Sequence, residues 1–194
     1  SDDSVQFLFK VDELDESIVT KQNGRSALFK VGDDHLAKGN GRLFIGFEGD
    51  NVVVNSNDSS MVIGKKSDFV STGWHHFAMS VNRPLNHFNV YMDSKLTYQS
   101  DANTIDGLAS DYAALGDSAM VGNFDIFVQW ETALPDYYIK DFFNSGFYGT
   151  EMGMKNYLPF HYNTSNSQDT RVLVFSANNE VVKYDADGNV STKK

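Results

Sequence analysis

The sequence predicts an all-β protein. Aromatic residues make up 13% of the 194 residues, with 15 phenylalanines and 9 tyrosines, and aromatic side chains favour strands. Fifteen glycines against three prolines fit many strands joined by tight turns. Several segments also alternate apolar and polar residues with the period of two that is typical of a half-buried strand. A chain of this length suits one domain, so we expect a single domain over residues 1–194.

The clearest pair of strands is Gly73–Val81 and Phe88–Leu96. Both alternate apolar and polar residues, and the connection between them is rich in turn-forming residues, which predicts a β-hairpin. We expect Trp74, at the start of the first strand, to lie in the core. His75 and His76 point to opposite faces of one strand, so they cannot hold a metal together and are expected to be structural.

Four more strands are predicted before this hairpin. They are Val5–Val11, Ala27–Val31, Arg42–Glu48 and Asn51–Asn55. The last two flank Gly49 and Asp50, which tolerate the positive φ that a short hairpin turn needs.

The second half of the chain gives weaker signals. We expect a polar segment at Ser100–Asp117 with a helical turn at Leu108–Leu115, a strand at Ser118–Asn123, a loop at Phe124–Asp136 and a strand at Tyr137–Phe143. A short helix at Thr150–Leu158, with Thr150 as N-cap and Pro159 after it, is followed by a polar linker and by strands at Arg171–Phe175 and Val181–Tyr184.

The order of these segments resembles that of the concanavalin-A-like fold in its laminin-G and pentraxin branch. The motif of a tryptophan opening one strand and Tyr91-x-Asp93-x-Lys95 closing the next is similar to the hairpin of those jelly rolls, and Glu151–Leu158 is similar to their closing helix. The resemblance covers about residues 5–158 and implies a two-sheet antiparallel β-sandwich with one or two short helices. One family strand is missing from the N-terminus, so we expect the strand pair within residues 160–194 to pack on the sandwich and complete a sheet edge.

Charge narrows the choice of partner. Sixteen basic against 26 acidic residues give a net charge of −10, which argues against nucleic acid and anionic membranes. The sequence has no apolar run of about 18 residues, which predicts no membrane insertion. The N-terminus is polar and carries no signal peptide, so we expect a module of a larger multidomain protein. With no cysteine, disulfides, thiolate metal sites and cysteine nucleophiles are excluded.

The resemblance also implies a Ca²⁺ cofactor. Pentraxin-like members build a calcium site from the loop before the strand that matches Arg42–Glu48 and from residues after a later strand. The matching residues here are Asp33, Asp34 and Asn40, together with Asn123 and Asp125. Their oxygens suit calcium, although Asp and Asn also populate loops because they stabilise turns.

Four residues beside the proposed metal loop are candidates for contact with a ligand: Trp130, Glu131, Tyr137 and Tyr138. Aromatic faces there would stack on sugar rings or on an aromatic side chain. A tryptophan in a loop can instead cover the edge of a core, and both interpretations of Trp130 stay open.

The sequence does not favour an enzyme. Glucanases of this fold carry acidic residues alternating on one strand, and no such strand is present. Alginate lyases of the fold carry Arg-Ser/Thr-Glu-Leu-Arg, whereas Arg25–Phe29 lacks the glutamate and the second arginine. We therefore expect an extracellular or cell-surface, calcium-dependent adhesion module that binds a glycan through loops at one end of the sandwich. The alternatives are a peptide-binding adhesin module and a structural or assembly domain without a small ligand.

Overall fold

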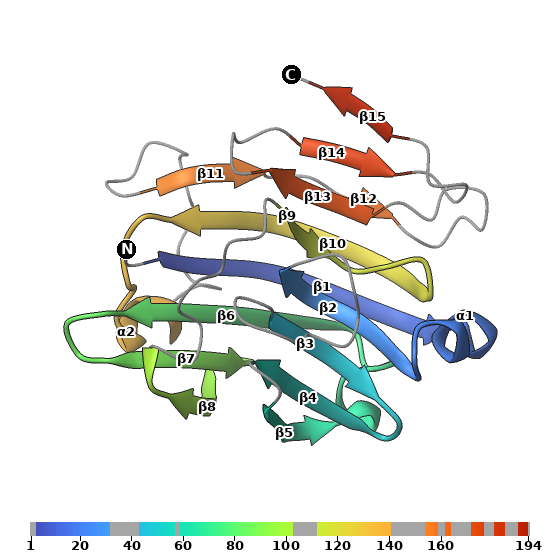
Figure 1. Ribbon diagram of the computed structural model, residues 1–194, viewed down its shortest axis with the longest axis horizontal. Coiled ribbons are helices and arrows are strands. Elements are labelled where there is room, and N and C mark those ends of the chain that lie inside the picture. Colours follow the sequence, from blue (N-terminus) through green and yellow to red (C-terminus); the bar gives the residue numbers. More distant parts are fainter. Residues whose placement is uncertain are drawn as a thin grey trace. The chain divides into compact units, whose positions relative to one another are not determined.

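The computed structural model describes residues 3–31, 43–56, 59–102, 112–140, 154–158, 162–163, 172–176, 181–184 and 190–193 (Figure 1). They form two antiparallel β-sheets and only two short α-helices, which confirms the predicted all-β sandwich. The chain divides into two compact units. The first comprises residues 1–9, 74–104 and 124–162, and the second comprises residues 10–73, 105–123 and 163–194. No helix in the described part is long and apolar enough to cross a membrane.

The first sheet has seven strands, in the order β11-β10-β1-β6-β7-β8, with β12 paired to β10. Their bounds are β1 Asp3–Leu14, β6 Trp74–Asn82, β7 His87–Met92, β8 Lys95–Ser100, β10 Met120–Trp130, β11 Met154–Leu158 and β12 Tyr162–Asn163. Strands β6 and β7 are the hairpin that the sequence predicted, with Ser80 opposite Asn89.

One face of this sheet is a cluster of phenylalanines. The ring of Phe7 stacks on Phe77 at 4.7 Å between centroids and meets the edge of Phe124 at 5.7 Å. It also stacks with Phe127 at 6.5 Å, so two β10 residues three positions apart share a face. Ile126, which lies between these two residues, has a positive φ of 47°. This local irregularity shifts the alternation of side chains along the strand by one residue.

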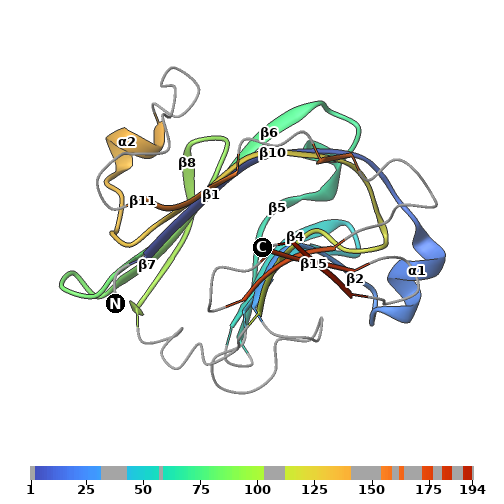
Figure 2. The same cartoon turned by 90° about the horizontal axis from the view of Figure 1, so that it is seen from above.

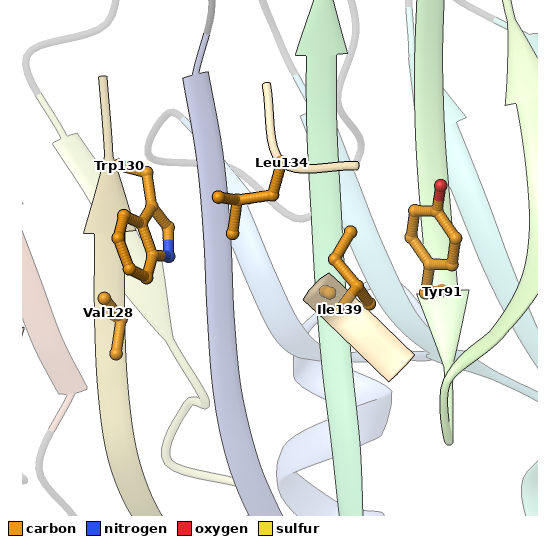
Figure 3. Packing of buried hydrophobic residues seen from close by; sticks show 6 residues of the cluster. Tyr91, Val128, Trp130, Leu134 and Ile139 are labelled. Atoms are coloured by element: carbon orange, nitrogen blue, oxygen red, sulfur yellow. The ribbon is translucent and has the colours of Figure 1, made fainter. Parts of the chain in front are cut away.

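The other face is covered at one end by helix α2, Asp136–Lys140. Ile139 from this helix is fully buried against a cluster that includes Ala78, Val128, Trp130 and Leu134. Figure 3 shows Ile139 and Leu134 in front of the strands, level with Trp130 and Val128 of β10. A single helical turn is therefore held by tertiary packing rather than by its own propensity.

The second sheet has eight strands, in the order β15-β14-β13-β9-β2-β3-β4-β5. Their bounds are β2 Arg25–Val31, β3 Leu43–Glu48, β4 Asn51–Ser56, β5 Ser59–Lys65, β9 Tyr112–Leu115, β13 Val172–Ser176, β14 Val181–Tyr184 and β15 Val190–Lys193. The predicted turn at Gly49 and Asp50 joins β3 to β4. Strand β13 pairs with β9, so β13, β14 and β15 extend one edge of this sheet.

Two short helices complete the second unit, namely α1, Glu16–Lys21, and the 3₁₀ turn η1, Lys66–Asp68. Asp15 caps α1 by accepting hydrogen bonds from the backbone N–H groups of Ser17 and Ile18. The hydroxyl of Ser17 also donates to this carboxylate and lowers the pKa of Asp15. In the view of Figure 2, α1 lies next to β2 and α2 lies to one side of β8 and β11.

The buried carboxylate of Asp117 ties the second unit together. One oxygen accepts from the hydroxyl of Ser26 at 2.9 Å and from the backbone N–H of Ala119 at 3.1 Å. The other accepts from the N–H of Ala27 at 2.6 Å and from the Gln22 amide at 3.1 Å. Four donors converge on one side chain that is 3% exposed, which offsets the cost of burying its charge.

Several predictions about local structure were wrong. Residues 124–130 continue strand β10 instead of forming a loop. Residues 137–140 of the strand predicted at 137–143 belong to helix α2, and the rest of that prediction lies outside the described residues. Residues 154–158 form β11 rather than the end of a helix, because they pair with β10 between Phe127 and Trp130. Tyr112–Leu115 is strand β9, not part of a helical turn.

The core prediction for Trp74 was also wrong, since this residue is 46% exposed. The aromatic core position of the hairpin is instead taken by Phe77, which is fully buried. Strand β5 was missed because its residues face solvent along most of its length and give no clean alternation.

Candidate functional site

The register of the first sheet gathers uncharged polar side chains on one face. Ser80 on β6 lies opposite Asn89 on β7, and Asn89 lies opposite Gln99 on β8. One rung further along the hairpin, Asn82 lies opposite His87. Because alternate residues of a strand share a face, the two rungs form a continuous polar surface over three strands.

This surface is the floor of a groove of about 320 Å³ within the first unit. We call it the β6–β8 groove. It is lined by Ser80, Asn82, Leu85, His87, Asn89, Tyr91, Leu96, Gln99, Ala133, Leu134, Pro135 and Asp136. The floor thus comes from the strands, and one wall comes from the segment that leads into α2.

A chain of hydrogen bonds orders the floor. The Gln99 amide donates to Asn89 Oδ1 at 2.9 Å, and Asn89 Nδ2 donates to the Tyr91 hydroxyl at 3.4 Å. That hydroxyl donates in turn to the carboxylate of Asp136. Burial and the neighbouring Asp136 carboxylate raise the pKa of Tyr91, so the phenol stays protonated and keeps its donor role. Each amide is therefore held in one orientation before a ligand arrives.

The wall is anchored to the sheet from below. The Ser4 hydroxyl on β1 donates to the carbonyl of Thr132 at 2.7 Å and accepts from the N–H of Leu134 at 2.9 Å. Leu134 and Ile139 are buried in the cluster drawn in Figure 3, beside the ring of Tyr91. The groove is consequently built on fixed elements rather than on free loops.

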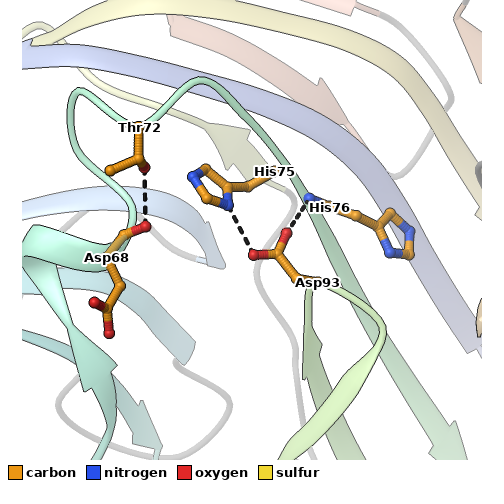
Figure 4. Close-up of polar contacts among 5 residues, drawn as sticks. All are labelled: Asp68, Thr72, His75, His76 and Asp93. Carbon is orange, nitrogen blue, oxygen red and sulfur yellow. Dashed lines mark hydrogen bonds and ion pairs between the residues drawn. The ribbon is translucent and has the colours of Figure 1, made fainter.

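The hairpin turn beyond β7 fixes the alignment of the floor. Asp93 and Ser94 both have positive φ, 50° and 66°, as the tight turn between β7 and β8 requires. The Asp93 carboxylate contacts His75 Nδ1 at 2.7 Å and accepts from the backbone N–H of His76 at 3.0 Å (Figure 4). This fixed turn sets the register that places Gln99 opposite Asn89.

The two histidines of β6 have the structural roles predicted for them. His76 is fully buried, and its Nε2 lies 3.1 Å from the side-chain oxygen of Gln6 on β1. Burial lowers the pKa of His76 to about 4, against a smaller opposing effect of Asp93. Figure 4 shows the His75 and His76 rings on either side of Asp93, and it also shows the hydroxyl of Thr72 bonded to the carbonyl of Asp68.

The four residues predicted to contact a ligand lie on the segment around this wall. Trp130 is 2% exposed and meets the ring of Tyr138 edge-on at 5.5 Å, so it covers the core. Glu131 is exposed directly after β10, and Tyr137 on α2 is 74% exposed. Of the four, Tyr137 presents the most ring surface to solvent, one residue after Asp136 of the groove.

The predicted calcium ligands fall partly outside the described residues. Asp33, Asp34 and Asn40 lie outside them, whereas Asn123 and Asp125 lie on β10. Asp125 Oδ1 accepts from the N–H of Ile126 at 2.9 Å and so stabilises the local backbone. Among the described residues no group of three or more His, Cys, Asp or Glu side chains is placed to hold a metal. Asn123 and Asp125 alone supply fewer than the roughly six oxygens that calcium takes.

A larger hollow of about 680 Å³ lies in the second unit. Four of its five ionisable side chains form ion pairs: Arg25 with Glu48, and Lys66 with Glu16 at 3.6 Å. The Arg25 guanidinium also lies 5.1 Å from the centre of the Phe44 ring. These groups are occupied in holding the sheet and α1, so the β6–β8 groove is the stronger candidate.

Sequence reasoning missed the groove. The signal was present in the hairpin, because Ser80 and Asn82 on one strand and His87 and Asn89 on the other occupy alternate positions. Uncharged amides on such positions are less usual than the lysines and glutamates of a merely solvated strand face. Only the pairing with β8 brings Gln99 into the same row.

Comparison with known proteins gives a fold but no family. No family model and no curated protein sequence matches the chain. A protein from Bacteroides ovatus thought to bind carbohydrate has a TM-score of 0.57 at 16% identity. The match covers 100% of this chain and 51% of that one, so the chain spans about half the length of that protein.

Two further structures show weaker likeness. Domain 4 of an extracellular GH43 arabinanase from Geobacillus stearothermophilus, solved with arabinotriose, has a TM-score of 0.48 at 18% identity, over 72% of this chain and 65% of that one. A heptameric SAP-like pentraxin from Limulus polyphemus has a TM-score of 0.49 at 13% identity, over 89% and 82%. The likeness to the Bacteroides ovatus protein, together with the two antiparallel sheets, confirms the jelly-roll fold that the sequence resembled.

Proposed function

We propose that this domain is a carbohydrate-binding module that holds a glycan in the β6–β8 groove. The observation that carries the proposal is the hydrogen-bonded pair of Asn89 on β7 and Gln99 on β8, which lies in one row with the buried Ser80 of β6. Amide side chains donate and accept hydrogen bonds at once, which matches the hydroxyl groups of a sugar. A concave site with a few converging polar groups beside apolar walls is the usual form of a small-ligand site.

The walls suit the other side of a sugar ring. Leu85 is 64% exposed and Leu96 is 45% exposed, and both line the groove. Tyr137 adds an exposed aromatic ring next to the wall. Apolar and aromatic surfaces of this kind pack against the C–H faces of sugars while the floor bonds the hydroxyls.

The comparison with the Bacteroides ovatus protein supports the same class of ligand, because that protein is thought to bind carbohydrate and shares the fold. Since the chain spans about half of its length, we propose that the module works as part of a larger multidomain protein. An extracellular or cell-surface location, with adhesion to glycans there, is the setting that this proposal implies.

We propose binding without turnover. Asp136 carries the only carboxylate among the described residues that line the groove, and it accepts a hydrogen bond from the hydroxyl of Tyr91. Glycoside hydrolysis usually requires a pair of carboxyl groups on opposite sides of the bond. Incubation with the bound polysaccharide should release no new reducing ends, and their appearance would contradict this part of the proposal.

Dependence on calcium is a finer proposal with its own test. Asn123 and Asp125 supply oxygen donors, and Asp33, Asp34 and Asn40 are the expected partners. Calcium that binds only the native state raises the free energy of unfolding by RT ln(1 + [L]/Kd), where [L] is the free calcium concentration, and so raises the melting temperature. We expect a rise with calcium that chelator reverses and that Asp125→Ala removes. An unchanged melting temperature would take calcium out of the proposal and leave the groove untouched.

The main experiment compares variants on a glycan array and then by isothermal titration with the best glycan. Asn89→Ala should weaken binding, because it removes the amide that links Gln99 to Tyr91. Asn51→Ala is the matched control, an exposed asparagine outside the groove. Equal loss in both variants, or a peptide bound in preference to every glycan, would overturn the proposed function.

A further inference from the structure

We infer that the β6–β8 groove selects neutral glycans and rejects acidic ones such as uronates and sulfated sugars. The inference rests on the proposed function and specifies its ligand class. It follows from the side chains that line the described part of the groove, which include one carboxylate and no lysine or arginine.

None of the twelve lining residues that the structure describes is lysine or arginine. Recognition of a carboxylate or sulfate normally uses a cation, most often arginine in a two-pronged contact. Seven of the lining side chains are instead polar or ionisable without a permanent positive charge: Ser80, Asn82, His87, Asn89, Tyr91, Gln99 and Asp136. An acidic group that enters the groove would lose its bound water and would meet no fixed positive charge in return, which disfavours binding.

The one acidic side chain in the described part of the lining adds repulsion. Asp136 is positioned by its bond from Tyr91, and a phenol that stays protonated does not cancel the carboxylate charge. Two like charges about 5 Å apart at a partly solvated surface weaken binding by about tenfold. The net charge of −10 over the chain disfavours the approach of polyanions further.

The floor offers what a neutral sugar needs. Gln99 and Asn89 are already bonded to each other, so their remaining donor and acceptor positions face the ligand in a set geometry. Asn82 is held in the same way, because its side-chain oxygen accepts from the N–H of Leu85 at 3.1 Å. Hydrogen bonds from preorganised neutral groups to sugar hydroxyls favour binding, and no charged group has to lose its water.

The size of the groove fits a short stretch of sugar chain. Its volume of about 320 Å³ lies at the lower end of the range for small-ligand sites. Binding of a neutral glycan should therefore depend on hydrogen bonds and shape, and hardly on salt. Binding of a polyanion by a cationic site would weaken steeply with salt.

The test is affinity electrophoresis and titration with two panels, neutral arabinan, β-glucan and galactomannan against acidic polygalacturonate, alginate and chondroitin sulfate, each at low and high salt. We expect binding only from the neutral panel, with an affinity that does not change with salt. Asn89→Ala should lower that affinity about tenfold, whereas Asn51→Ala should not.

A charge-introducing variant makes the inference sharper. Gln99→Lys places a cation in the floor and should bring acidic polysaccharides into the groove with a salt-sensitive affinity, while the matched surface change Asn51→Lys should not. Circular dichroism checks that both variants fold.

The outcomes distinguish a wrong ligand class from a wrong binding site. Acidic glycans bound in preference by the unchanged protein would overturn the inference and leave the proposed function standing. A neutral glycan whose affinity survives Asn89→Ala would overturn the groove as the site. No binding from either panel would overturn both.

Discussion

The buried histidine of β6 makes stability depend on pH. His76 is fully buried, with its Nε2 next to Gln6, and burial lowers its pKa from 6.5 to about 4. The native state therefore holds this imidazole neutral, whereas the unfolded chain protonates it below about pH 6.5. The contribution of His76 to the free energy of unfolding is therefore fully present above the pKa of the unfolded state. It is lost as the pH falls towards 4.

The size of the effect follows from the shift. A pKa difference of about 2.5 units corresponds to about 3 kcal/mol of unfolding free energy between pH 7 and pH 4. That is a large fraction of the roughly 5–15 kcal/mol that stabilises a typical domain. Carboxyl groups also titrate over this range. The contribution of His76 therefore has to be measured as the difference between the unchanged protein and a variant that lacks this histidine.

The assay is urea denaturation from pH 7 to pH 4 for the unchanged protein and for His76→Gln, which removes the titrating group and keeps a polar side chain beside Gln6. The substitution should cost stability at pH 7, and the gap between the two proteins should shrink by about 3 kcal/mol towards pH 4. Asn51→Ala, an exposed change that removes no titrating group, is the control and should leave the pH profile nearly parallel. A gap between the proteins that stays constant from pH 7 to pH 4 would refute the reasoning.

Four further substitutions test the buried hydrogen bonds and the packing by urea denaturation. Asp117→Ala removes the acceptor of four hydrogen bonds and should cost at least about 2 kcal/mol, so a loss below about 0.5 kcal/mol would mean that water replaces it readily. Gly122→Ala would place a methyl group 1.8 Å from the carbonyl oxygen of Lys10, and we expect it to cost about 1–3 kcal/mol; full stability would show that the two strands separate without strain. Trp130→Ala should cost about 3–5 kcal/mol and Trp74→Ala much less, and the reverse order would contradict the burial of these two residues.

The stability tests also bear on the groove. Trp130 packs in the cluster that contains Leu134 and Tyr91, both of which line the groove. Its truncation should therefore loosen the wall and weaken glycan binding even though Trp130 lies beneath the surface. The aromatic residue that sequence reasoning placed at the ligand would then influence binding through the wall that it supports.

The parts of the fold that the sequence predicted well are those with local causes. The turn at Gly49 and Asp50 and the β6–β7 hairpin depend on residues within a few positions of one another. The predictions failed where a distant partner decides. Met154–Leu158 has the residues of a weak helix, yet β10 offers a strand to pair with, and the backbone hydrogen bonds of that pairing outweigh the local preference.

The candidate site divides in the same way. The sequence by itself determined that the hairpin strands alternate, and that the chain is acidic and lacks cysteine. Only the tertiary structure decided that Gln99 joins this row, that the segment ending in Asp136 forms the wall, and that Trp130 is buried beneath it. The physical reason is that alternation is a property of a single strand, whereas register and burial arise only when separate strands and a helix pack against one another.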